Sequence, residues 1–270
     1  MNLQIFQVDA FSKEPFHGNP AAIVPLDEWL PTETMQAIAL ENNLAETAYF
    51  IPEGDGYGLR WFTPTVEMDL CGHATLASAH VLYKVLGETT DVLRFHTKSG
   101  ELTVAREGDR LVLDFPARPA TIAEAPRGLI EAIGLEPREI LKARDYLLVY
   151  DTEDDIRAID PDFNALAKIK THAVIVTAKG KESDFVSRFF APEVGVNEDP
   201  VTGSAHCTLI PYWAGKLDKT ELYARQLSAR GGELFCELLG DRVKIGGNAV
   251  LYLQGEIFIE EAYSDATANV

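Results

Sequence analysis

The pattern of apolar and polar residues predicts strands and helices from the start of the chain. Residues 3–8 alternate between apolar and polar, as in a strand with one buried face. Over 32–42 the apolar residues recur at helical spacing, and Asn42-Asn43 end the predicted helix. Further strands are predicted at residues 21–24, 46–51, 59–63, 92–97, 101–106 and 110–115.

The pattern restarts after a proline-rich stretch. Residues 116–126 contain three prolines and are predicted to form a linker. Short helices are predicted beyond it at 127–134 and 161–168. Strands are predicted at 146–150, 172–177, 233–238, 242–246 and 249–258.

Blocks of sequence recur in the same order in both halves. Residues 60–64 (RWFTP) are matched by 188–192 (RFFAP), and residues 72–74 (GHA) by 203–205 (GSA). Two glycine-containing blocks further along the first half recur in the second at nearly the same spacing. The repeat predicts two similar halves that arose by duplication.

We therefore expect an α+β protein whose halves are residues 1–117 and 118–270. The last predicted strand, 249–258, could pack with the first half although it belongs to the second half in sequence. A chain of 270 residues is long enough for two ordinary domains. Its 46% apolar and 24% charged residues are typical of a soluble globular protein.

Charge and cysteine content argue against several classes of protein. The formal net charge is −18 and there is no basic block, which disfavours a nucleic-acid or anionic-membrane partner. We find neither a signal-peptide pattern nor an apolar run of about 18 residues, so no membrane span is expected. The three cysteines, Cys71, Cys207 and Cys236, lack CxxC spacing and suggest reduced thiols in the cytoplasm.

Each half contains a glycine turn that leads into a helix with small first residues. Free backbone N–H groups and the helix dipole make the helix starts at Gly72 and Gly203 candidate anion sites. The alternative is that these glycines only permit a tight turn and close packing. A polar residue follows the glycine in both copies, His73 and Ser204, and this favours the site. We expect a small anionic metabolite to bind between the two helix starts, in a cleft between the halves.

Three side chains are candidates for proton transfer. Glu46 lies where a helix exit joins an apolar strand, a position from which an acid often points into a cleft. His73 lies near a helix N-terminus, which favours its neutral form and suits it to shuttle protons. Asp199 lies in a short insertion that the first half lacks. Structural roles in caps and turns are the alternatives for His73 and Asp199.

Cys71 is the ambiguous residue of the first turn. Beside a helix N-terminus its thiol could have a lowered pKa and act as a base or nucleophile, although a small buried thiol is the simpler interpretation. Cys71-Gly72-His73 and His206-Cys207 contain metal-ligand residue types, but no second pair stands at zinc-like spacing. Nucleotide-binding and serine-hydrolase signatures are missing from the sequence, so we expect neither a metal nor a cofactor.

These motifs resemble those of the PhzF family, the phenazine-biosynthesis-like isomerases. The matching segments are VDAF, FHGNPAAIV, AETAYF, RWFTPTVEMDLCGHATLASAHVL and EDPVTGSAH. The resemblance implies the diaminopimelate-epimerase-like fold, in which each half is a curved, barrel-like sheet around a central helix and the active site lies between the halves. It also implies a cofactor-independent enzyme that is commonly a homodimer.

The resemblance implies roles for individual residues. The founding member isomerises dihydro-3-hydroxyanthranilate through a glutamate that moves a proton between carbons, and this glutamate matches Glu46. The supporting histidine, aspartate and serine of the family match His73, Asp199 and Ser204. Gly72, Thr202 and Gly203 complete the expected substrate-binding residues. The founding enzyme is similar to Ala-Gly-His-Pro-Thr at the first turn, where this chain has Cys-Gly-His-Ala-Thr, so the substrate stays open.

Three functions are compatible with these residues. The favoured one is a cofactor-independent isomerase in which Glu46 moves a proton between carbons of a small carboxylate. The second is an amino-acid-type racemase or epimerase with Cys71 as a base, although the second catalytic thiol of the epimerases would fall at Pro200. The third is a metabolite-binding protein without catalysis, which ranks last because all the matched site residues are present.

Overall fold

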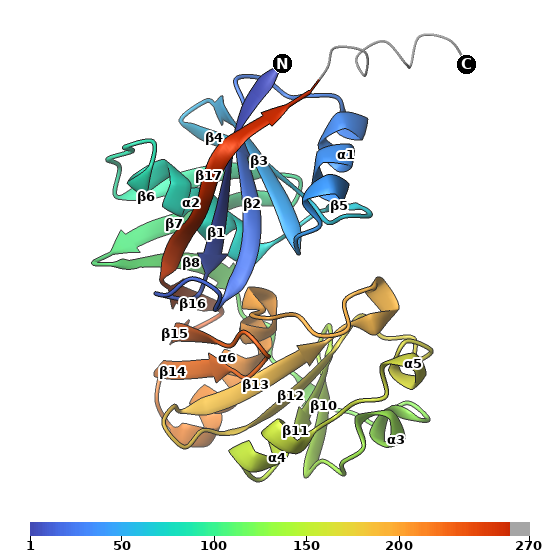
Figure 1. The fold of residues 1–270 in the computed structure, drawn as a ribbon. Helices are drawn as coiled ribbons and strands as arrows, with labels where there is room; N and C mark the ends of the chain where they lie inside the picture. Colours follow the sequence, from blue (N-terminus) through green and yellow to red (C-terminus); the bar gives the residue numbers. More distant parts are fainter. Residues whose placement is uncertain (260–270) are drawn as a thin grey trace. The chain divides into compact units, whose positions relative to one another are not determined.

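The computed structural model describes residues 1–259, which form two compact units. Unit 1 contains Met1–Phe16, Pro20–Leu113 and the chain from Asn248 onward, and unit 2 contains His17–Asn19 and Asp114–Gly247. Each unit is built mainly of β-strands with few helices (Figure 1). The predicted α+β class is confirmed.

Unit 1 is a sheet in which strands far apart in the sequence are neighbours. Its first strand, β1 (Asn2–Ala10), pairs antiparallel with its last, β17 (Ala249–Phe258), from Asn2 opposite Phe258 to Ala10 opposite Ala249. The other side of β1 pairs with β2. The remaining strands of unit 1 are β2 (Asn19–Pro25), β3 (Glu46–Glu53), β4 (Gly56–Phe62), β5 (Glu67–Met68), β6 (Val92–Thr97), β7 (Gly100–Glu107) and β8 (Arg110–Pro116).

Helix α2 (Gly72–Lys84) is the centre of unit 1. All of its residues except His80 and Lys84 are buried, whereas a surface helix would expose a polar face. The helix packs against strands β1, β3, β7 and β17, and its alanines let these strands approach closely. The sheet therefore curves around a central helix, as the family resemblance implied. The second helix of the unit, α1 (Thr32–Asn42), packs on β3 through Met35, Ile38 and Ala39.

Unit 2 repeats the topology of unit 1. From β2 onward, the pairings of unit 1 are parallel, antiparallel, parallel, antiparallel and antiparallel. The pairings from β11 onward follow the same order. The central helix of unit 2 is α6 (Gly203–Leu217). It lies in the chain between the parallel partners β13 and β14, as α2 lies between the parallel partners β4 and β6. The shared topology agrees with the sequence repeat, while the duplication itself stays a prediction.

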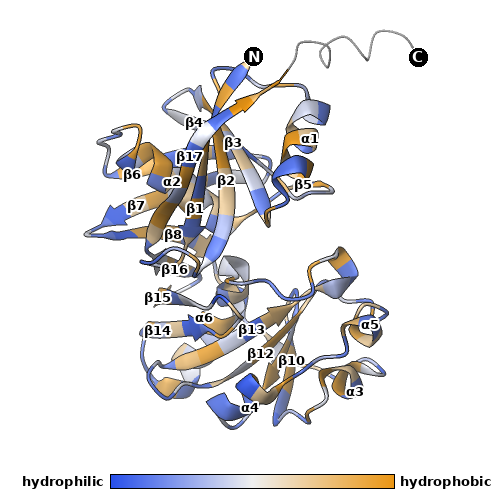
Figure 2. Ribbon diagram, in the orientation of Figure 1, coloured by the Kyte–Doolittle hydropathy of each residue, from blue (hydrophilic) through white to orange (hydrophobic). Residues whose placement is uncertain are grey.

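The strands of unit 2 are β9 (Thr121–Ile122), β10 (Glu139–Lys142), β11 (Tyr146–Val149), β12 (Val174–Lys179), β13 (Phe185–Phe190), β14 (Glu221–Gln226), β15 (Gly232–Leu239) and β16 (Arg242–Gly247). Short helices α3 (Leu129–Ile133), α4 (Glu153–Ala158), α5 (Phe163–Leu166) and the 3-10 helix η1 (Pro192–Val194) connect them. Figure 2 shows apolar residues along β12 and β13, and these strands line the core of the unit.

Two departures from the predicted elements have physical reasons. The expected linker at 116–126 contains β9, which pairs with β10, because the prolines flank this two-residue strand and do not interrupt it. The sequence pattern also gave no prediction for β13, because its residues are apolar on both faces and therefore do not alternate. Helix α4 was not predicted either, although Thr152 and Asp155 form a capping box at its start, and this residue pattern is a sequence signal for a helix N-terminus.

A proline inside α6 ties the helix to the chain that enters unit 2. Pro211 has no N–H, so the carbonyl of Cys207, four residues earlier, lacks its usual helical donor. The N–H of Arg118 donates to this carbonyl at 2.8 Å. The lost helical hydrogen bond is thereby replaced, and the segment after β8 is held against α6. Across residues 1–259, none of the helices is both long enough and apolar enough to span a membrane.

The burial of α2 predicts a contrast between two leucine truncations. Leu76 in α2 is fully buried, so Leu76→Ala is expected to lower the free energy of unfolding by about 2–5 kcal/mol. Leu40 in α1 is exposed, and Leu40→Ala is expected to change it by no more than about 0.5 kcal/mol. Denaturant unfolding of both variants checks this, and equal effects would contradict an enclosed α2.

Candidate functional site

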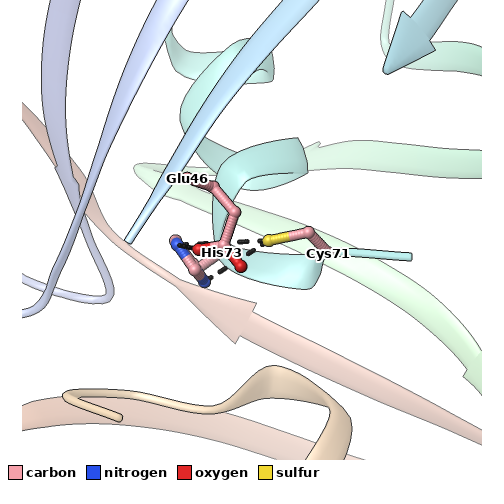
Figure 3. A group of neighbouring side chains, drawn as sticks. All are labelled: Glu46, Cys71 and His73. Carbon is pink, nitrogen blue, oxygen red and sulfur yellow. Dashed lines mark hydrogen bonds and ion pairs between the residues drawn. The ribbon is translucent and has the colours of Figure 1, made fainter. Parts of the chain in front are cut away.

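Glu46, Cys71 and His73 form one cluster in unit 1 (Figure 3). Nε2 of His73 lies 2.8 Å from Oε2 of Glu46, and Nδ1 lies 3.5 Å from Sγ of Cys71. The imidazole therefore lies between a carboxylate and a thiol. His73 and Cys71 are buried, and the Glu46 side chain is 14% exposed.

Local structure places each of the three residues. Glu46 is the first residue of β3 and lies opposite Ala21 of the parallel strand β2. Cys71 is the N-cap of α2 in an extended conformation, and His73 is the second residue of the helix. The hydroxyl of Thr75 donates to the Cys71 carbonyl at 2.5 Å, which fixes the turn into the helix.

The pKa values of Cys71 and His73 depend on burial and on the other members of the cluster. Burial, and secondly the Glu46 carboxylate, raise the pKa of the Cys71 thiol to about 11, which agrees with the simpler interpretation of a small buried thiol and not with a thiol activated by the helix N-terminus. Burial opposes the charged form of His73, but its interactions with Cys71 and with the Glu46 carboxylate outweigh burial and raise the pKa of His73 well above its usual value. The expected preference of His73 for the neutral form is therefore wrong, because a carboxylate lies 2.8 Å from the ring.

One carboxylate oxygen of the cluster has an unusual environment. Oε2 of Glu46 is buried, yet it accepts no hydrogen bond from the described residues. Nε2 of His73, 2.8 Å away, forms an ion pair with this oxygen. Buried carboxylate oxygens normally accept hydrogen bonds as well, and none of residues 1–259 supplies one here.

Both carboxylate oxygens of Asp199, in unit 2, accept hydrogen bonds from neighbouring side chains. Its Oδ1 accepts a hydrogen bond from Nδ2 of Asn19 at 2.8 Å, and its Oδ2 accepts one from the hydroxyl of Thr202. Gln226, at the end of β14, donates to the Asp199 carbonyl at 2.8 Å and accepts from the Thr202 N–H at 2.9 Å. Asn19 and Gln226 are both buried, so they hold the Asp199 carboxylate and the start of α6 in one arrangement.

The start of α6 carries the remaining predicted residues. Thr202 is the N-cap, and its hydroxyl is engaged by Asp199, so neither α6 nor α2 has a side-chain capping hydrogen bond. Gly203 is buried, whereas Ser204 is half-buried. Nδ1 of His206 donates to the Thr202 carbonyl at 2.8 Å, as Thr75 does to that of Cys71. Burial lowers the pKa of His206 to about 4, so this histidine is a neutral structural residue.

The family model for phenazine biosynthesis-like proteins, PhzC-PhzF, matches residues 8–255. The chain belongs to the PhzF family. It is 56% identical over 259 residues to an uncharacterized isomerase of Pseudomonas aeruginosa, covering 96% of this chain and 100% of that protein. This confirms the expected enzyme class, an isomerase.

Solved structures support the same family. A PhzF family protein of Enterococcus faecalis superposes with a TM-score of 0.94 at 46% identity, covering 96% of this chain and 100% of that one. A putative PhzC/PhzF protein of Clostridium difficile gives a TM-score of 0.90 at 44% identity, with 95% and 100% covered. The predicted diaminopimelate-epimerase-like fold is thus confirmed.

An arginine–glutamate clamp, which sequence reasoning missed, occurs in both units of this PhzF protein. Arg60 donates to both carboxylate oxygens of Glu67, at 2.7 and 2.9 Å. Arg188 donates to both oxygens of Glu198, at 2.7 and 3.0 Å. Each arginine also lies over a phenylalanine two residues further along its strand. The clamps tie the segment before each central helix to β4 or β13, and Glu198 directly precedes Asp199.

A signal for these clamps exists in the sequence. The arginines belong to the repeated blocks 60–64 and 188–192, and Glu67 and Glu198 stand at the same distance before the Gly72 and Gly203 turns. For Asn19 and Gln226 no local pattern was available, because their roles depend on which chain segments meet in unit 2.

The clamps predict a matched pair of effects on stability. All four side chains are at most 20% exposed, so removing one carboxylate charge leaves a poorly solvated guanidinium. We expect Glu67→Gln and Glu198→Gln each to lower the free energy of unfolding by about 1–3 kcal/mol. The exposed Lys181–Asp154 pair supplies the control, because Asp154→Asn makes the same chemical change where solvent screens it. Thermal unfolding is the measurement, and a loss for Asp154→Asn equal to the other two would contradict the clamps.

Proposed function

We propose that this protein is an isomerase that moves a proton between carbons of a small carboxylate-bearing metabolite, with Glu46 as acid and base. The observation that carries the proposal is Oε2 of Glu46, a buried carboxylate oxygen that accepts no hydrogen bond from residues 1–259. A carboxylate within reach of a substrate C–H group can act as a general base. The histidine beside it is the second support.

The proposed reaction has two proton transfers. In the first, Glu46 removes a proton from a carbon next to an activating group, and the C–H electron pair enters the conjugated system of the substrate. In the second, the protonated Glu46 delivers this proton to another carbon of that system, and the double bond is shifted. His73, 2.8 Å from the carboxylate, orients Glu46 for both transfers.

Substrate binding is assigned to the two helix starts. Gly72 at the start of α2 and Gly203 and Ser204 at the start of α6 supply backbone N–H groups and a hydroxyl suited to a carboxylate. Asp199 is proposed to assist the proton transfer, on the family resemblance. Because the Thr202 hydroxyl donates to Asp199, we assign Thr202 a positioning role.

Replacement of Glu46 by its amide tests the proposal. Glu46→Gln removes the proton acceptor but keeps the shape, so deuterium incorporation from solvent into a turned-over substrate is expected to fall by at least about 100-fold. The measurement is mass spectrometry or NMR over a panel of small unsaturated carboxylic acids in D₂O. Glu41→Gln, on the exposed side of α1, is the control and is expected to exchange like the natural protein.

Two outcomes would contradict the assignment. Exchange that is unchanged in Glu46→Gln would remove Glu46 from the reaction. Tight ligands that the natural protein never turns over would instead favour the metabolite-binding function.

A racemase or epimerase is the second candidate, because Sγ of Cys71 lies 3.5 Å from Nδ1 of His73. In that case His73 would take the thiol proton and Cys71 would remove a proton from the substrate. The pKa of about 11 weakens this candidate, since the thiolate is scarce at neutral pH. A second thiol is also not at hand in unit 2, where Pro200 occupies the matching position and Cys207 is buried inside α6.

Replacement of Cys71 by serine separates the two candidates. If Glu46 alone transfers the proton, Cys71→Ser is expected to change the exchange rate by less than about tenfold, because the side chain keeps its size and a hydrogen-bonding group. Loss of exchange in Cys71→Ser with retained folding, together with loss of optical activity from a chiral substrate, would favour the racemase.

We also propose a cytoplasmic homodimer. The support is the family resemblance and the three cysteines, which are all free and buried within residues 1–259.

A further inference from the structure

Three different metal-ligand atoms meet at the Glu46–Cys71–His73 cluster. A carboxylate oxygen, a thiol sulfur and an imidazole nitrogen all lie within 4.8 Å of one another. The sequence motif showed only Cys71 and His73, and the third donor comes from β3. The prediction that no metal binds was therefore made without the residue that completes the set.

The separations are close to those that a single ion requires. Zinc binds sulfur at about 2.3 Å, imidazole nitrogen at about 2.0–2.1 Å and carboxylate oxygen at about 2.0–2.2 Å, so donors on one ion stand roughly 3–3.7 Å apart. Nε2 of His73 lies 2.8 Å from Oε2 of Glu46 and 4.0 Å from Sγ of Cys71. All three donor atoms lie within 4.8 Å of one another, so they can approach one ion through Nε2 if the side chains move closer together.

The environment also favours a bound ion. Oε2 of Glu46 accepts no hydrogen bond among the described residues and has His73 as its ion-pair partner, so a cation bound to both side chains would replace that ion pair. The Glu46 side chain is 14% exposed, against 6% for His73. A sulfur, a nitrogen and an oxygen together suit a borderline cation such as Zn²⁺, whereas Mg²⁺ and Ca²⁺ prefer oxygen ligands alone.

We propose that Glu46, Cys71 and His73 form a chelating site for a thiophilic divalent cation, and that the cation inhibits the enzyme. Binding releases the Cys71 thiol proton and any second proton on His73 to solvent, so affinity rises with pH. Three protein ligands leave a fourth position for water. The bound ion occupies the Oε2 lone pair of Glu46, which can then no longer accept a proton from a carbon.

The chelating site and its inhibitory effect are argued from different observations. Chelation follows from the three side chains alone. Inhibition rests on the proposed function, in which Glu46 is the acid and base. The experiment therefore measures metal binding without turnover and then measures exchange separately.

Cobalt(II) is the probe for the binding step, because thiolate ligation gives a near-ultraviolet sulfur-to-cobalt charge-transfer band. We expect the reduced full-length protein to bind one equivalent with this band and with the visible bands of a four-coordinate ion. Cys71→Ser is expected to lose the charge-transfer band, and Glu46→Gln to bind at least tenfold more weakly. Cys236→Ser is the matched control, because Cys236 is also a buried free thiol but lies on β15, and it is expected to bind like the natural protein.

Each outcome decides one part of the proposal. A natural protein without the band, or a band that survives in folded Cys71→Ser, overturns the chelating site. Zn²⁺ at one equivalent is expected to stop deuterium exchange, and EDTA to restore it. Exchange that continues with the site filled overturns the inhibition, whereas cobalt binding by a protein that exchanges no substrate overturns the proposed function and leaves the chelating site standing.

Discussion

Helix α2 is enclosed by the sheet of unit 1, and the chemistry of the unit depends on this enclosure. A helix start has backbone N–H groups without helical partners, and here the start is buried together with the side chains around it. Polar groups placed there must find partners within the protein. Cys71, His73 and Glu46 satisfy this requirement only in part, because one oxygen of Glu46 receives no hydrogen bond from residues 1–259. This incomplete pairing is the feature on which the proposed role of Glu46 rests.

Unit 2 has the same topology but a different distribution of donors. The position of His73 is taken by Ser204, and the position of Thr75 by His206, which is neutral and serves only to hold the helix turn. The acid of this unit, Asp199, receives hydrogen bonds from Asn19 and Thr202 on its two oxygens. Glu46, by contrast, has one oxygen that pairs with His73 and accepts no hydrogen bond from the described residues. The two acids therefore have different surroundings on the same topology.

The sequence allowed much of this to be predicted, and the limits have physical causes. Strands that alternate, such as β1 and β6, were found because one face of each is buried and the other is not. The candidate residues Glu46 and His73 were found from local context and from the family resemblance. Their contact was not predictable, because it depends on how α2 packs against β3, which no local pattern sets. The role of Asn19 could not be predicted for the same reason, because its partner Asp199 lies 180 residues further along the chain.

The pairing of β1 with β17 has a consequence for how the chain acquires its structure during synthesis. The first strand to leave the ribosome finds its antiparallel partner only when the last described strand has been made. Until then one edge of β1, with its N–H and C=O groups, has no strand to bind. Contacts between residues so far apart in sequence are slow to form, because a long loop must close first. Unit 2, whose long continuous segment from Asp114 to Gly247 is complete earlier, can therefore fold while unit 1 is still waiting for its final strand.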